Sequence, residues 1–171
     1  FEKRFAEYSG TTYALGVDNG TNALILALLA LGIGPGDEVI TAPNSFLASA
    51  SSIALTGATP VFADVRDDFN LDPARLEAAI TPRTKAIMAV HLYGQPCEMD
   101  AIQQLAECHG LAIIEDAAQA HGMEYFSSRR GSWRKCGSLG ALSTFSFYAN
   151  KTMTTGEGGM LVTRDAQLVA R

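Results

Sequence analysis

The sequence has few cysteines and lacks the spacing patterns of metal sites. Its three cysteines, Cys97, Cys108 and Cys136, are odd in number and show no C-x-x-C spacing, which argues against a disulfide framework and against a zinc site. The three histidines form neither an H-x-x-x-H nor an H-E-x-x-H pattern, so no metal site is predicted from them. This cysteine content is typical of a reducing, cytoplasmic compartment.

Signatures of nucleotide binding, of membrane spans and of nucleic-acid binding are missing as well. No G-x-x-x-x-G-K-[ST] loop occurs and no G-x-G-x-x-G follows an expected strand, which removes the usual support for ATP or NAD. No apolar run approaches the ~20 residues that a membrane-spanning helix needs, and no signal peptide precedes the first expected strand. A net charge of −5 without a long basic run argues against nucleic acid or an anionic membrane as the main partner. The basic segment 129–135 is interpreted as a solvated loop.

The composition is that of an ordinary soluble globular domain. The chain has 171 residues, of which 47% are hydrophobic and 18% are charged, and this predicts one domain over residues 1–171. The sequence begins with Phe1 and stops at Arg171, inside an expected helix that begins near Asp165. We therefore expect the chain to be a piece of a longer protein.

Apolar runs of four to eight residues alternate with helical patterns along most of the chain. This alternation predicts β-α-β units and a mainly parallel sheet. The expected strands are 13–17, 38–42, 60–64, 85–92 and 111–115, and the expected helices are 21–31, 45–55, 72–80 and 98–109. Asp72 and Pro73 fit the N-cap and the first position of the third helix.

The pattern changes after Asp116. A loop containing Gly131 and Trp133 is expected there, followed by two strands at 141–148 and 159–163. About ten residues separate these strands, which is too few for a helical crossover between parallel neighbours. One of the two strands is therefore predicted to run antiparallel to the rest of the sheet.

Lys151 follows an aromatic, strand-like run and precedes the glycine-rich turn GEGG. Most lysines are solvated surface charges, and this interpretation stays open. A lysine at the end of a strand, held away from bulk water, can instead lose its proton and act as a nucleophile. Strand ends are where α/β folds place their chemistry.

Two further segments carry groups that suit a charged ligand. The turn 18–22 joins the first strand to the first helix, so its free N–H groups and the Thr21 hydroxyl could bind a phosphate, although an ordinary turn with a Thr cap fits equally well. Asp116 ends a buried strand and is either a helix N-cap or the partner of a positively charged ring nitrogen. Gln119 could donate to an oxygen of the same ligand if a helix begins at Asp116.

A lysine nucleophile, an aspartate for a pyridinium, a phosphate site and an α/β frame together are typical of a pyridoxal-phosphate enzyme. The segments NGTNALILALLALGIGPGDEVI, PNSFLASASSIALTGATPVFADV, HLYGQP, IIEDAAQAHG and FSFYANKTMTTGEGGM resemble, in order, the motifs of the DegT/StrS family of nucleotide-sugar aminotransferases. The resemblance covers essentially the whole chain. It implies the three-layer α/β/α large domain of the aspartate aminotransferase type I fold, mostly parallel with one antiparallel strand.

The resemblance also implies a role for individual residues. Lys151 matches the lysine that holds pyridoxal 5'-phosphate as a Schiff base and moves the proton between substrate and cofactor. Asp116 matches the partner of the pyridine nitrogen and Gln119 the residue near the ring hydroxyl. The remaining cofactor ligands that it implies are Ser146, Thr21 and Asn22 for the phosphate and Phe46 for stacking on the ring.

The function implied is transfer of an amino group from a donor such as L-glutamate to a keto-sugar nucleotide. The alternative is a non-catalytic regulator or sensor that keeps the fold and the cofactor. The resemblance further implies a homodimer for the full-length protein, and a small C-terminal domain that this chain does not contain. Because that domain and the partner subunit complete the sugar-nucleotide pocket in relatives, the particular sugar is not predicted.

Overall fold

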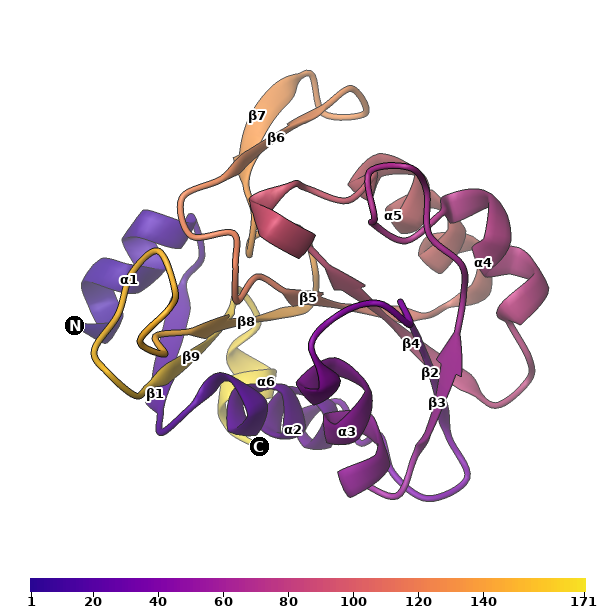
Figure 1. Cartoon of the computed structure of the whole chain (residues 1–171), viewed down its shortest axis with the longest axis horizontal. Coiled ribbons are helices and arrows are strands. Elements are labelled where there is room, and N and C mark those ends of the chain that lie inside the picture. The colour runs from indigo at the N-terminus through magenta and orange to yellow at the C-terminus, as the bar shows by residue number, and fades with distance from the viewer.

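The computed structural model describes all residues, 1–171, as a central seven-stranded sheet with helices on both faces (Figure 1). The strand order is β1-β9-β8-β5-β4-β2-β3. The strands of this sheet are β1 (Tyr13–Val17), β2 (Glu38–Thr41), β3 (Thr59–Phe62), β4 (Thr84–Val90), β5 (Ala112–Asp116), β8 (Leu142–Ser146) and β9 (Gly159–Thr163). The helices are α1 (Glu2–Ser9), α2 (Gly20–Ala30), α3 (Leu47–Leu55), α4 (Pro73–Ala79), η1 (Leu92–Gly94), α5 (Met99–His109) and α6 (Ala166–Val169).

The strand directions confirm the predicted mixed sheet. β2, β3, β4, β5 and β8 pair in parallel, whereas β9 is antiparallel to both of its neighbours, β8 and β1. The short connection from β8 to β9 explains this, because a parallel neighbour would need a crossover of a dozen or more residues. The five central strands β2, β4, β5, β8 and β9 are buried almost throughout, as expected for strands covered on both faces.

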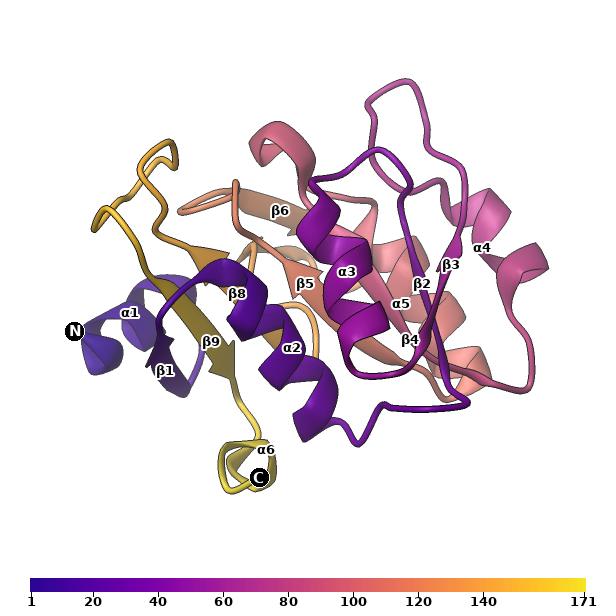
Figure 2. The same cartoon turned by 60° about the horizontal axis from the view of Figure 1, so that its bottom comes forward.

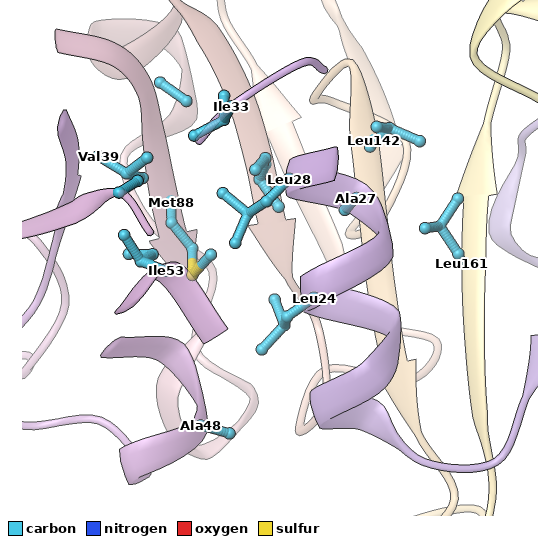
Figure 3. Packing of buried hydrophobic residues seen from close by; sticks show 13 residues of the cluster. Leu24, Ala27, Leu28, Ile33, Val39, Ala48, Ile53, Met88, Leu142 and Leu161 are labelled. Atoms are coloured by element: carbon cyan, nitrogen blue, oxygen red, sulfur yellow. The ribbon is translucent and has the colours of Figure 1, made fainter. Parts of the chain in front are cut away.

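Two helical layers cover the sheet. α2 and α3 lie on one face, and Figure 3 shows Leu24 and Leu28 of α2 beside Met88 of β4 in one buried cluster. α4 and α5 cover the opposite face over β2 and β4, and α1 covers that same face farther along, where Phe5 packs on Phe145. Figure 2 shows α2 and α3 side by side in front of the sheet. The three-layer α/β/α architecture is thus confirmed.

Apart from the single turn η1, α1 and a hairpin were not expected from the sequence. α1 was missed because it is mostly polar and only one side of it, with Phe5, Ala6 and Ser9, is buried. The segment after Asp116, expected to be a loop, contains a hairpin of β6 (Glu124–Ser127) and β7 (Ser132–Lys135) that projects from the body of the molecule (Figure 1). Strands this short, which do not alternate clearly between polar and apolar residues, give a weak signal in the sequence.

Several expected boundaries also shift by one to three residues. The strand expected at 141–148 ends at Ser146, so Lys151 lies in the following loop rather than at the strand end itself. α3 begins at Leu47 rather than at residue 45. Asp72 caps α4 as predicted, and its side chain accepts the Ala74 N–H at 3.0 Å. None of the helices has the length and apolar character needed to span a bilayer.

Candidate active site

The carboxyl ends of the parallel strands border a cavity of about 510 Å³. The start of α2, the start of α3 and the segments that follow β4, β5 and β8 all contribute to its wall. In open α/β sheets this edge is where ligands bind. The cavity brings together all seven residues predicted from the sequence, which are Thr21, Asn22, Phe46, Asp116, Gln119, Ser146 and Lys151.

The N-terminus of α2 points its free backbone N–H groups into this cavity. Asn19, not Thr21, is the N-cap, and its side chain accepts the Asn22 N–H at 2.8 Å. The N–H groups of Gly20 and Thr21 precede the first helical hydrogen bond, so they remain available to an anion. The Asn22 amide is held by Asp18, to whose two carboxylate oxygens it donates at 2.8 and 2.9 Å.

Two glycines allow α2 to approach the sheet closely. A Cβ on Gly20 would lie 2.8 Å from the Cβ of Ser146, and a Cβ on Gly159 would collide with the Asn19 carbonyl. Ser146 ends β8 on the face that packs against α2, as the burial of Leu142 in the α2 cluster shows. The Ser146 hydroxyl therefore lies beside the first turn of α2, and the two together form an anion-binding corner.

Asp116 is the buried carboxylate of the cavity. Its Oδ2 accepts the Ser49 hydroxyl at 2.9 Å and its Oδ1 accepts the Ala118 N–H at 3.1 Å. Burial raises the pKa of Asp116, and these two hydrogen bonds and the charge of Lys151 offset the rise only in part. A cationic group of a ligand beside this carboxylate would balance its negative charge.

Gln119 lies near Asp116, but no helix begins at Asp116. Residues 117–120 form a turn, so the helical spacing considered for these two residues is wrong. The side chain of Gln119 is fixed from the other side, because its Oε1 accepts the Tyr93 N–H at 2.6 Å. Its amide nitrogen is left as a donor toward the cavity.

Lys151 and Phe46 are the last two of the predicted residues in the wall. Lys151 is half-buried in the loop between β8 and β9, and its backbone N–H donates to the Tyr148 carbonyl at 2.9 Å. The positive charge of Lys151 lowers the pKa of Asp116 and that of His121. Phe46 precedes α3, and the residue is 72% exposed, so it is accessible to a flat ligand.

Sequence reasoning missed the residues that hold Asp116 in place. Ser49 is one, and its position two residues after the start of α3 carried no signal by itself. The neighbouring carboxylate, Glu115, points away from the cavity and is fully buried. It accepts five hydrogen bonds, from the N–H groups of Gly137, Leu139 and Gly140, from the Ser143 hydroxyl and from His91 Nε2.

These contacts keep Glu115 charged in the interior. Burial raises the pKa of Glu115, but the His91 and backbone donors outweigh it and hold the pKa below its usual value. His91 Nδ1 accepts the Cys97 N–H at 3.1 Å, so the ring proton lies on Nε2 and is donated to Glu115. The pair anchors the base of the β6–β7 hairpin to β5, directly beside Asp116.

His121 differs from His91 because neither of its ring nitrogens has a hydrogen-bond partner. The ring is 4% exposed and lies 5.3 Å from the ring of Phe145 and 5.7 Å from that of Phe147, measured between centroids. Burial, together with the charge of Lys151, lowers the pKa of His121 to about 4, and the nearby Ser146 backbone, although it does not form a regular hydrogen bond with the ring, opposes this shift only in part. This histidine is therefore neutral at physiological pH.

These groups fit pyridoxal phosphate in each of its parts. The corner at Gly20 and Ser146 suits the phosphate, Asp116 suits the ring nitrogen, and the amide nitrogen of Gln119 suits the ring hydroxyl. The side-chain amine of Lys151 suits the aldehyde of the cofactor, with which it can form a covalent bond. A cavity of about 510 Å³ leaves room beyond a cofactor of this size for part of a substrate.

The sheet topology and the cavity are typical of the cofactor-binding domain of pyridoxal-phosphate-dependent enzymes of fold type I. Residues 1–171 match the DegT/DnrJ/EryC1/StrS aminotransferase family along their whole length, and the chain belongs to this family.

Similar proteins include enzymes and one protein with a regulatory name. The GDP-perosamine synthase of Caulobacter vibrioides is 57% identical over 172 residues, which cover 100% of this chain and 45% of that protein. The pleiotropic regulatory protein of Geobacillus stearothermophilus is 48% identical over 173 residues, which cover 99% of this chain and 45% of that protein.

A solved structure shows the same fold at similar identity. DesV of S. venezuelae, determined in complex with a ketimine intermediate, superimposes with a TM-score of 0.91 and 49% identity over 99% of this chain and 45% of that one. The chain thus spans less than half the length of the relatives it matches.

Proposed function

We propose that the complete protein is a transaminase that moves an amino group from an amino acid, with L-glutamate as the expected donor, to a keto-sugar nucleotide. The main support is the cavity in which Lys151, Asp116, Gln119 and Ser146 meet. The 57% identity to a GDP-perosamine synthase favours a nucleotide sugar as the acceptor. In this proposal residues 1–171 are the cofactor-binding large domain of a homodimer, and a small C-terminal domain completes the substrate pocket.

Lys151 is proposed to hold the cofactor covalently through Nζ and, once released, to carry the proton between the two carbon atoms that exchange it. When bound, the cofactor supplies an electron sink for the electrons of the broken C–H bond. Asp116 keeps a positive charge on the ring nitrogen, because the carboxylate stabilises the protonated form. Ser49 and the Ala118 N–H hold that carboxylate in one orientation.

The other residues position the cofactor. The N–H groups of Gly20 and Thr21 and the hydroxyls of Thr21 and Ser146 bind its phosphate, helped by the positive end of α2, and Asn22 supports this turn through its hydrogen bonds to Asp18. Phe46 covers one face of the ring and fixes its plane. The free amide nitrogen of Gln119 donates to the ring hydroxyl.

A regulator or sensor that keeps the cofactor without turnover is the second candidate. One relative with a regulatory name, 48% identical, favours it. The presence of Lys151 in the cavity favours an enzyme instead, because turnover needs a group that carries the proton between substrate and cofactor. The two proposals differ in turnover and not in cofactor binding.

The test has two parts, both on the complete protein. Borohydride reduction followed by peptide mapping should place the cofactor label on Lys151, and a label on Lys85 or Lys135 in its place would refute the assignment. An amino-transfer assay over a panel of keto-sugar nucleotides with L-glutamate should show turnover. Labelling of Lys151 without turnover on any member of the panel would favour the regulator.

A further inference from the structure

Two aromatic residues, Phe69 and Tyr93, are the only non-glycine residues of the chain with positive φ, at 67° and 55°. The left-handed region is sterically unfavourable for bulky side chains. Burial does not compensate for this, because the side chains are 56% and 79% exposed. Their rings meet edge to face with centroids 6.5 Å apart. We call this pair the aromatic shelf.

The strained backbone of the shelf is held by the hydrogen bonds of a buried asparagine. Asn70, which is 1% exposed, accepts the Leu92 N–H at 3.1 Å and donates to the Gln95 carbonyl at 3.0 Å, so it joins the segment of Phe69 to the segment of Tyr93. Strain of this kind persists where the surrounding structure enforces it, and it is concentrated at ligand sites. The rings are thus presented to solvent in a fixed arrangement.

The shelf is bonded to the wall of the candidate active site, although neither of its rings lines the cavity. The Tyr93 N–H donates to Gln119 Oε1, and Gln119 and Leu92 both line the cavity. On the other side, Asn44 donates to the Phe69 carbonyl at 3.0 Å and so ties the shelf to the segment that carries Phe46. Figure 2 shows the loop between β3 and α4 at the same edge of the sheet as the N-terminal end of α3.

The residue types of the aromatic shelf indicate which part of a ligand could bind there. Neither Phe69 nor Tyr93 carries a charge, and they are tied in place by the amide side chains of Asn44, Asn70 and Gln119. A diphosphate would find no cation among these groups. Exposed ring faces suit a flat or C–H-rich ring that has no charge.

We propose that the aromatic shelf binds an uncharged ring face of the acceptor substrate, either its nucleobase or the C–H face of its hexose. This rests on the proposed function, since it assumes a nucleotide-sugar acceptor. Gln119 lines the cavity and its side chain bonds to the Tyr93 N–H, so an acceptor that extends past Gln119 reaches the shelf. The shelf then sets acceptor affinity and takes no part in the reaction with the amino donor.

Tyr93→Gly in the complete protein tests the shelf. Glycine removes the ring and also the backbone strain, so a purely structural role predicts equal or higher stability and unchanged kinetics. We expect the KM for the acceptor to rise about tenfold, the loss of one ring stack, with the KM for the amino donor unchanged. Tyr93→Phe, which keeps the ring, should stay much closer to the parent. Trp133→Gly removes an exposed aromatic from the β6–β7 hairpin and is the matched control.

Calorimetric titration with a free nucleoside diphosphate identifies the ring. If Tyr93→Gly weakens this binding, the shelf holds the nucleobase, whereas an effect confined to the intact nucleotide sugar points to the hexose. An unchanged acceptor KM, an equal rise in donor KM, or dissociation into monomers would overturn the proposal, the last by showing that the shelf is an interface between copies. If the parent protein turns over and Tyr93→Gly has the same acceptor KM, only the proposed role of the shelf is refuted. A parent without Lys151 labelling and turnover refutes the proposed function itself.

Discussion

Replacement of His121 by leucine should make the complete protein less sensitive to acid. In the folded chain the pKa of His121 is lowered to about 4, because the ring is buried against Phe145 and Phe147 and the charge of Lys151 acts on it, which together outweigh the opposing effect of the Ser146 backbone. In the unfolded chain the pKa returns to about 6.5. Below about pH 6.5 the unfolded state binds a proton that the folded state does not bind. The free energy of unfolding is therefore at its full value above about pH 6.5 and falls as the pH drops toward 4.

The size of the effect follows from these two pKa values. Between pH 7 and pH 5 the parent should lose about 2 kcal/mol of unfolding free energy through His121 alone. The His121→Leu variant lacks this loss, while its constant packing cost cancels in the comparison of the two pH values. Urea unfolding of the apoprotein, followed by circular dichroism at both pH values, measures the difference. Equal acid sensitivity in parent and variant would refute the assignment of a neutral, unpaired His121.

Three further predictions concern the cofactor site. Asp116→Asn should fold and bind cofactor but lose most activity, because an amide stabilises the protonated ring nitrogen less well than a carboxylate, and turnover at the parent rate would exclude this role. Gly20→Ala places a Cβ 2.8 Å from the Cβ of Ser146, so absorbance titration should show cofactor binding about tenfold or more weaker, and parent affinity would contradict the phosphate corner. Ser49→Ala removes a hydrogen-bond donor to Asp116 and should raise the pKa of the Asp116 carboxyl further. The acid limb of the pH–activity profile should therefore move to higher pH. An acid limb at the parent position would show that Ser49 does not tune Asp116.

The layers of the sheet and the order of the main elements were predictable from local sequence. Apolar runs alternate with helical patterns from Tyr13 onward, and the short connection before Gly159 predicts an antiparallel strand. α1 and the β6–β7 hairpin were not predictable in this way. α1 owes its place to the packing of Phe5 against Phe145 and Phe147, which lie 140 or more positions farther along the chain.

The candidate site, like the fold, was predictable from local sequence only in part. The motifs around Thr21, Asp116 and Lys151 singled out the residues that line the cavity, because each motif is a short segment whose residue types are typical of its chemistry. The contacts that fix these residues were decided by the tertiary structure. Ser49 reaches Asp116 across 67 positions, and Tyr93 reaches Gln119 across 26.

The physical reason is that such contacts depend on the order of strands in the sheet. A local pattern sets whether a segment becomes a strand or a helix, but strand order follows from the joint packing of all segments. The side-by-side order of β8, β5, β4 and β2 brings the ends of these strands to one edge. The sequence by itself determined which residue types end each strand, and only the tertiary structure decided that they face one cavity and that two strained aromatic rings stand beside it.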